Sequence, residues 1–165
     1  MKIKIPIKYL PNSLTKKDKI KQLKMLQKSK KMYKNQQYYT RDKVESYPSK
    51  KSKHIIKAQK IYNIKNMLPN KELSLKSGCS IDALNQIIKK GEGAYYSSGS
   101  RPNQTAQSWG LARLASALTG GKSAAVDYSI IERGCKHNKR AFILANKSKR
   151  TYKYGLRKNK KVTIN

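Results

Sequence analysis

The sequence predicts a mostly α-helical protein, with a small central helical domain and extended Lys-rich arms at its N- and C-terminal ends. Three observations lead to this prediction. Apolar residues recur at helical spacing in several segments, only 37% of the 165 residues are hydrophobic, and positive charge is concentrated at both ends. A modest core is therefore expected in the centre, and the arms are expected to fold only partly without a partner.

Charge divides the chain into three segments. Residues 1–60 contain 19 basic and 3 acidic residues, residues 61–135 contain 9 and 5, and residues 136–165 contain 11 and none. We expect a basic N-terminal arm with one or two helices, a central helical domain, and a basic C-terminal tail, in that order. A net charge of +31 on one chain repels itself in a compact body, which makes a polyanion the natural partner.

The first element is short. Lys and Ile alternate at the start of residues 1–7, which favours a strand or an extended arm with one apolar face. A helix is predicted over residues 15–35, with Thr15 or Ser13 as its cap. Its expected apolar face consists of Ile20, Leu23, Leu26 and Tyr33.

The next segments lead into the central domain. Residues 36–52 contain several Tyr, Ser and Lys residues and are expected to form a loop, whereas residues 53–62 have the spacing of a short helix. Ser80 is placed to cap a helix over residues 81–90, and Gly91 follows as its C-terminal stop.

The second half of the chain begins with a loop. Residues 91–104 are polar and rich in turn-forming residues, and a helix with a wide apolar arc is predicted over residues 105–118. A last short helix is expected over residues 124–133. Beyond it, only residues 141–145 are apolar, within the basic C-terminal tail.

The two cysteines, Cys79 and Cys135, are too few and too far apart for a zinc site. We expect them to be free and reduced in an intracellular protein, and a bridge between them is testable by non-reducing mass spectrometry. The sequence has no apolar run of membrane-spanning length and no signal peptide, so a soluble, non-secreted protein is expected.

The loop and the helix after it contain residues suited to nucleic acid. Arg101 and Arg113 flank a helix N-terminus, where free N–H groups attract a phosphate, and Tyr95 and Tyr96 are suited to stacking on an unpaired base. A structural role is the more common alternative. Arg113 is equally well placed to lie over the Trp109 indole or to pair with Asp127.

The same stretch carries a signature. It consists of Gly93-Ala94-Tyr95, Arg101-Pro102, the segment from Trp109 to Arg113, and Asp127. This combination resembles an uncharacterised protein family of giant DNA viruses and large tailed phages, and the resemblance covers about residues 14–133. It implies a viral origin, a role in the virion or on viral nucleic acid, and a location in the virion and, during assembly, in the host cytoplasm or nucleus.

The sequence offers little for catalysis. His54 and His137 lie among lysines about 80 residues apart, and the acidic residues show no spacing suited to two-metal chemistry. The Gly91-x-Gly93 pair lacks the third glycine of a dinucleotide loop, and Gly120-Gly121-Lys122-Ser123 lacks the earlier glycine of a phosphate-binding loop. We therefore expect a non-enzymatic protein without cofactor, metal or small-molecule substrate.

Three functions fit these features. The first is a virion protein that binds nucleic acid, most simply viral genomic DNA, without sequence preference and condenses it. The second is a minor capsid or inner-shell protein whose arms bridge acidic surfaces of capsid proteins. The third is an RNA- or ribosome-associated basic protein.

The candidate polyanion contacts fall into two groups. Those in the two arms are Lys16, Lys17, Lys50, Lys51, Arg140, Lys149 and Arg150. Those in the signature loop are Tyr95, Arg101 and Arg113.

Overall fold

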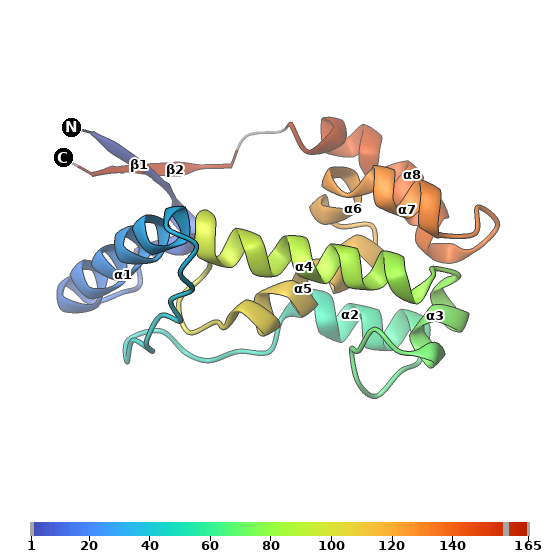
Figure 1. Ribbon diagram of the computed structural model, residues 1–165, viewed down its shortest axis with the longest axis horizontal. Helices are drawn as coiled ribbons and strands as arrows, with labels where there is room; N and C mark the ends of the chain where they lie inside the picture. Colours follow the sequence, from blue (N-terminus) through green and yellow to red (C-terminus); the bar gives the residue numbers. More distant parts are fainter. Residues whose placement is uncertain (1, 157–158, 165) are drawn as a thin grey trace. The chain divides into compact units, whose positions relative to one another are not determined.

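The computed structural model describes residues 2–156 and 159–164, and this part of the chain is mostly α-helical, as predicted (Figure 1). It contains eight α-helices, two 3-10 helices and one two-stranded sheet. In chain order the elements are β1 (Ile3–Pro6), η1 (Ile7–Tyr9), α1 (Lys16–Lys34), α2 (Lys53–Tyr62), α3 (Lys71–Ser77), α4 (Ile81–Ser97), α5 (Ala106–Leu118), α6 (Lys122–Val126), α7 (Tyr128–Gly134), α8 (Arg140–Thr151), η2 (Lys153–Gly155) and β2 (Lys161–Ile164).

The described chain forms two compact units, each assembled from separate stretches of sequence. Unit 1 contains residues from the ranges 1–50, 92–109 and 159–165, and unit 2 contains residues from 51–91 and 110–158. The divisions fall inside α4 and α5, so that each of these helices contributes to both units. The units therefore group residues differently from the three segments that charge suggests.

Unit 1 joins the two ends of the chain. Strands β1 and β2 pair antiparallel, with Ile3 opposite Ile164 and Pro6 opposite Lys161. The alternation of Lys and Ile near the N-terminus thus forms a strand. A hydrophobic core cluster of unit 1 consists of the buried residues Ile5, Tyr9, Leu10, Leu14, Met25, Leu26 and Val44.

The buried face of α1 differs from the expected one. Ile20 and Tyr33, expected on the apolar face, are exposed, whereas Gln22 and Ser29 are buried. The Gln22 side-chain amide donates a hydrogen bond to the Tyr9 carbonyl oxygen (3.2 Å). Polar partners on neighbouring segments, which the spacing of apolar residues does not reveal, therefore decide which face of α1 is covered.

Unit 2 has a larger apolar core, to which all of its α-helices contribute. Buried Tyr62 of α2 donates a hydrogen bond to the Leu118 carbonyl oxygen at the end of α5, and burial raises the pKa of Tyr62. Helix α8 buries Ala141 and Ala145 in this core. The segment expected to be a basic tail therefore contains a packed helix.

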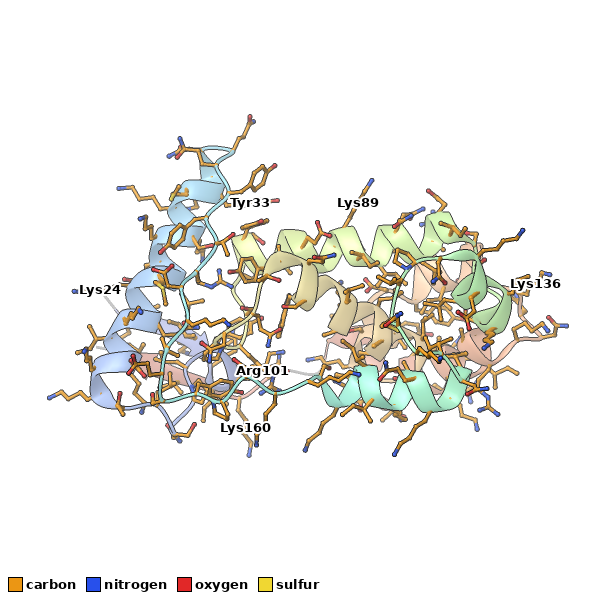
Figure 2. The ribbon with its side chains drawn as sticks, turned by 90° about the horizontal axis from the view of Figure 1, so that it is seen from below. Lys24, Tyr33, Lys89, Arg101, Lys136 and Lys160 are labelled. Atoms are coloured by element: carbon orange, nitrogen blue, oxygen red, sulfur yellow. A yellow bond between two sulfur atoms is a disulfide. The ribbon has the colours of Figure 1, made fainter. Side chains whose placement is uncertain are left out.

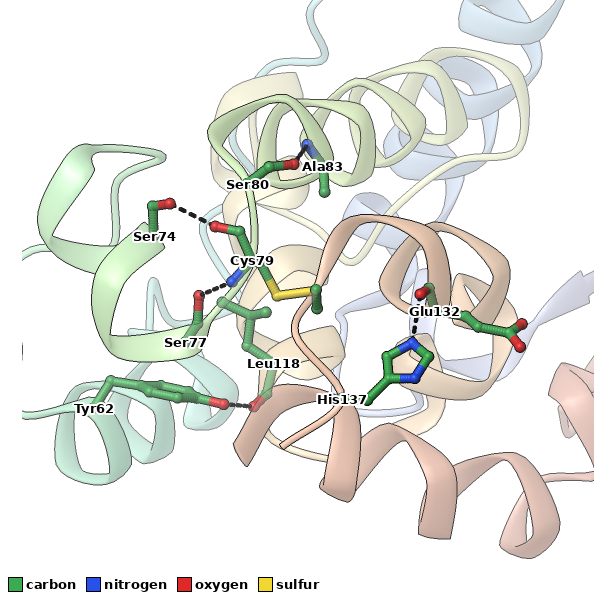
Figure 3. Close-up of a disulfide and its surroundings, with 10 residues drawn as sticks. Tyr62, Ser74, Ser77, Cys79, Ser80, Ala83, Leu118, Glu132 and His137 are labelled. Carbon is green, nitrogen blue, oxygen red and sulfur yellow. Dashed lines mark hydrogen bonds between the residues drawn. A yellow bond between two sulfur atoms is a disulfide. The ribbon is translucent and has the colours of Figure 1, made fainter. Parts of the chain in front are cut away.

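The cysteines correct another expectation, because Cys79 and Cys135 form a disulfide (Figure 3). They face each other in an isolated antiparallel bridge, and the adjacent Ser80 N–H donates to the Gly134 carbonyl oxygen (2.8 Å). The Ser74 hydroxyl donates to the Cys79 carbonyl oxygen (2.6 Å). The separation of 56 residues along the chain gives no indication of this proximity.

Helix α4 is longer than predicted. It begins after Ser80, whose hydroxyl accepts a hydrogen bond from the Ala83 N–H (3.1 Å), but it continues through Gly91 to Ser97. A Cβ atom at Gly91 would lie 2.7 Å from the Gly110 Cα atom of α5. Gly91 is thus a point of close helix packing rather than a helix stop, and the expected loop begins later.

Two smaller differences concern short helices. The helix expected over residues 124–133 is divided into α6 and α7, which meet at Asp127. Helix α3 was not predicted, although Asn70 caps it by accepting a hydrogen bond from the Leu73 N–H (2.9 Å). It spans seven residues, and its short apolar pattern is too brief to stand out in sequence.

Candidate nucleic-acid interface

Both units are strongly cationic. The sequence ranges of unit 1 contain 18 Lys and Arg and 4 acidic residues, a net of +14, whereas those of unit 2 contain 21 and 4, a net of +17. Folding mixes residues of the charged ends with residues of the nearly balanced centre. Basic side chains accordingly project from the ribbon throughout both units (Figure 2).

The predicted contacts are divided between the units. In unit 1, four of them are exposed: Lys16, Lys17, Lys50 and Arg101. In unit 2, three are exposed: Lys51, Arg140 and Arg150. Their side chains are accessible to a polyanion.

Lys149 is less available. It is half-buried, its ammonium donates to the Tyr128 hydroxyl (3.2 Å), and it lies over the Tyr128 ring at 4.5 Å from the centroid. Lys149 therefore already has a partner within unit 2, which weakens the case for it as a phosphate contact.

Arg113 has a structural partner, which confirms the alternative expected for it, a pair with Asp127. Its Nε and Nη2 atoms donate to the two carboxylate oxygens of Asp127, each at 2.8 Å. Asp127 is fully buried, and the Lys90 ammonium lies 3.7 Å from the same carboxylate. This bidentate pair fixes α5 against the junction of α6 and α7.

Tyr95 is also structural, because its side chain is fully buried and has no face open to a ligand. Its hydroxyl accepts a hydrogen bond from the Arg41 backbone N–H (2.9 Å), and the Arg41 guanidinium lies 3.8 Å from the centroid of its ring. The sequence shows that this position is aromatic but does not indicate that its side chain is buried. The prediction of Tyr95 as a stacking residue is therefore wrong for this structure.

Buried Arg41 is a functional candidate that the sequence did not indicate. Its Nη1 atom donates to the Tyr95 carbonyl oxygen (2.8 Å) and to the Ser29 hydroxyl (3.0 Å), and its Nη2 atom donates to the Ser100 hydroxyl (2.7 Å). The Ser29 hydroxyl in turn donates to the Tyr96 carbonyl oxygen (3.0 Å). Burial lowers the pKa of Arg41, although an arginine remains protonated in proteins.

This network links four parts of unit 1: α1, the segment after it, the last turn of α4, and Ser100 in the segment after α4. Carbonyl groups at a helix C-terminus lack intrahelical partners and carry partial negative charge, which suits a guanidinium. Arg41 therefore stabilises the end of α4 and holds the segment around residues 36–44 in place. No feature of the local sequence around Arg41 indicates that it is buried.

Next to this network, three tyrosines form a surface cluster. We call Tyr33, Tyr38 and Tyr96 the tyrosine cluster. The ring centroids of Tyr38 and Tyr96 are 5.1 Å apart, those of Tyr33 and Tyr38 6.1 Å, and those of Tyr33 and Tyr96 6.4 Å. Tyr33 lies in the last turn of α1 (Figure 2), and Tyr38 is 68% exposed.

Sequence reasoning found only one member of this cluster. The sequence predicts Tyr96 as a stacking residue together with Tyr95, and it places Tyr38 in a loop without a role. Tyr33 is predicted on the apolar face of the helix over residues 15–35. The members are brought together from distant positions, which the sequence alone does not indicate.

The family is shown by the sequence itself. A model of a family of unknown function (DUF5824) matches residues 6–132, more than half of the chain. The chain belongs to this family. No curated protein and no solved structure is significantly similar to the chain.

The DUF5824 region includes the features described above. Arg41, the tyrosine cluster and the Arg113–Asp127 pair all lie within residues 6–132, whereas α8 and β2 lie outside it. The matched family thus shares the stretch that contains the network and the cluster. Its description assigns no function to them.

The described residues contain no group of three or more His, Cys, Asp or Glu side chains that could hold a metal ion. Within residues 2–156 and 159–164, no helix has the length and apolarity needed to cross a bilayer. A surface hollow with a volume of about 370 Å³ lies in unit 2, with Asp82 and Arg133 as its charged lining residues.

Proposed function

We propose that this protein binds nucleic acid without sequence preference and condenses a viral genome in the virion, without catalysing a reaction. The observation that carries the proposal is the charge of the folded units. Both are strongly cationic, and if every acidic residue were paired with one cation, a net charge of +31 would still remain. Such a surplus favours a partner with dense negative charge.

Two features support nucleic acid as that partner. Lys heavily outnumbers Arg, which favours neutralisation of phosphates as point charges over bidentate recognition of bases. One of the few acidic groups is also neutralised within the protein. Asp127 is fully buried and paired with Arg113, so this carboxylate does not oppose an incoming phosphate at the surface.

The virion as the site of action has two supports. The signature around Tyr95 resembles a viral family, and the chain contains the Cys79–Cys135 disulfide. Disulfides persist in oxidising settings, such as virion surfaces, and are rare in the cytosol. A role within the finished particle agrees with both features.

The test is binding to two DNA duplexes of unrelated sequence over a series of salt concentrations. Both duplexes should bind with similar affinity, and the logarithm of the binding constant should fall linearly with the logarithm of the salt concentration. Lys16→Gln, Lys17→Gln and Lys50→Gln, combined in one variant, should reduce the slope by about 0.9 for each phosphate that the variant no longer neutralises.

The matched control changes the same three residues to Arg, which keeps their charge. Its slope should equal that of the wild type, because charge and not side-chain identity makes the contact. Absence of binding at low salt, or tight binding that ignores salt, would refute the proposal.

A second candidate is a minor capsid protein whose basic surface bridges acidic capsid subunits. It is favoured by exposed apolar side chains at the end of unit 2, where Leu156 is 81% and Tyr154 is 61% exposed. The charged phosphate backbone of a nucleic acid makes no favourable contact with apolar side chains, whereas a neighbouring protein would cover them. Gentle disruption of particles separates the candidates: a capsid protein stays with the shell, and a genome-binding protein leaves with the nucleic acid.

A further inference from the structure

The tyrosine cluster is an unusual use of aromatic residues in this chain. The sequence contains one Phe and one Trp, so tyrosines supply most of its aromatic surface. Burying a Tyr ring is favourable, yet Tyr33 and Tyr38 are exposed, and the Tyr38 ring is mostly open to solvent. An exposed aromatic cluster of this kind points to a ligand that covers it.

Exposed cations lie on the same helix, α1, as Tyr33 of the cluster. The last two turns of this helix contain Lys28, Lys30, Lys31 and Lys34, all exposed. Lys30 lies three residues before Tyr33 and therefore on the same side of the helix. The ammonium of Lys28 lies 4.5 Å from the centroid of the Tyr39 ring, next in sequence to Tyr38. The C-terminal end of α1 thus carries Tyr33 together with several exposed positive charges.

Buried hydrogen bonds next to the cluster also hold its residues in place. The Ser29 hydroxyl donates a hydrogen bond to the Tyr96 carbonyl oxygen of α4. The Arg41 guanidinium donates hydrogen bonds to the Ser29 hydroxyl and to the Tyr95 carbonyl oxygen. Arg41 follows Tyr38 by three residues, so its burial restrains the segment that carries Tyr38. Binding to a preformed surface costs less ordering of side chains than binding to mobile ones.

We propose that the tyrosine cluster is a stacking platform for unpaired bases, and that the preferred ligand of unit 1 is therefore single-stranded nucleic acid. The inference rests on the proposed function, since the exposed lysines of α1 hold the phosphates. Bases within a duplex already stack on one another and present no free face, whereas an unpaired base stacks on a Tyr ring. Every base has such a face, so the platform adds strand selectivity without sequence preference.

The test compares Tyr38→Leu with Tyr38→Phe. Leu keeps an apolar side chain but removes the flat ring, whereas Phe keeps the ring and removes only the hydroxyl. Because the side chain of Tyr38 is largely exposed, both variants should keep the fold, which circular dichroism and thermal unfolding will verify. Four probes are titrated by fluorescence anisotropy: oligo-dT, oligo-U, a DNA duplex, and an abasic strand with the same backbone but no bases.

Tyr38→Leu should lower the affinity for oligo-dT and oligo-U by on the order of ten-fold, as expected when one stacked base is removed from its ring. Its affinity for the duplex and the abasic strand should not change, and Tyr38→Phe should bind all probes as the wild type does. A reduction confined to oligo-dT or to oligo-U supports the platform and identifies the nucleic acid.

Other outcomes overturn the inference in distinguishable ways. If Tyr38→Leu binds every probe like the wild type, or binds all of them more weakly by the same factor, the platform is refuted while charge-driven binding stands. If the wild-type protein binds none of the probes at low salt, the proposed function fails together with the platform. Binding to an acidic protein surface would then become the alternative to examine.

Discussion

At the scale of single residues, Asp127 shows how a charged side chain, of a kind usually found at the surface, is stabilised in the protein interior. Its carboxylate is fully buried and receives two hydrogen bonds from Arg113. A buried charge is tolerated when its partner and its hydrogen bonds are complete, and removal of one partner leaves the other without compensation.

Replacing Asp127 by Asn should therefore lower the free energy of unfolding by about 3 kcal/mol. The matched control is Glu72→Gln, which breaks the exposed i, i+4 pair with Lys76 (3.1 Å). An exposed pair contributes little, so the control should change stability by less than about 0.5 kcal/mol. Urea denaturation of both variants provides the comparison, and equal destabilisation would contradict the structural role of Asp127.

A second carboxylate, Asp18, makes stability depend on acid pH. The hydroxyl and then the backbone N–H of Ser46 hydrogen-bond it, and they lower the pKa of Asp18 from its ordinary value of 3.8. Since the pKa of Asp18 is lower in the folded state than in the unfolded state, ionised Asp18 stabilises the folded state at pH values above its ordinary pKa. This stabilisation is lost as the pH falls through the folded pKa.

In Ser46→Ala, the pKa of Asp18 should move upward, because the largest cause of its depression is gone. An NMR titration of the Asp18 carboxyl carbon in both proteins measures this shift. The stability difference between wild type and variant should also shrink as the pH falls through the folded pKa. An Asp18 pKa that is the same in both proteins would show that Ser46 does not hold the carboxylate in solution.

At the scale of elements, α4 contains two glycines with different roles. A Cβ atom at Gly91 would lie 2.7 Å from the Gly110 Cα atom, whereas the nearest atom to a Cβ at Gly93 is the Tyr33 hydroxyl at 3.8 Å. The first distance is a clash with backbone that cannot easily move, and the second is an ordinary van der Waals contact. Only Gly91 is therefore required by packing.

Gly91→Ala should destabilise the protein by about 1–3 kcal/mol, the usual cost of overpacking, despite the better helix propensity of Ala. Gly93→Ala is the control in the same helix and should be neutral or stabilising by up to about 1 kcal/mol. Chemical denaturation of the two variants distinguishes them. The interpretation fails if both substitutions have the same sign and size.

At the scale of the whole molecule, the disulfide closes a large part of unit 2. It links residues separated by 56 positions, and on the chain-entropy model a loop of this length contributes about 4 kcal/mol. Reduction should therefore lower the midpoint of thermal unfolding markedly. The double variant Cys79→Ser with Cys135→Ser should unfold at the lower midpoint with or without reductant, and a wild type indifferent to reductant would count against the bridge.

Charge also acts at this scale. Both units carry a large net positive charge, so each opposes its own compaction and is expected to gain stability when a polyanion neutralises it. The charged ends of the chain contribute to this through folded elements: α1 and β1 at one end, and α8 and β2 at the other. The charged ends of the chain thus contribute to the cationic surface as folded helices and strands.

Much of the helical content was accessible from sequence. The predicted helices over residues 15–35, 53–62 and 105–118 agree closely with α1, α2 and α5, because their apolar spacing and capping residues are local signals. The end of α4 was misplaced, since Gly91 has the appearance of a helix stop unless the contact with α5 is known. The candidate site was predicted only in part, as exposed lysines and Tyr96.

Periodicity and composition are properties of the chain in its linear order, and they were sufficient to predict the mostly helical fold class and the cationic character of the protein. The folded structure was needed to show that Cys79 pairs with Cys135, that Tyr95 is buried against Arg41, and that Tyr33, Tyr38 and Tyr96 meet at the surface. These are contacts between distant positions. They depend on which faces of the helices are covered, and polar groups such as Gln22, Ser29 and Arg41 contribute to that choice through partners that no local pattern specifies.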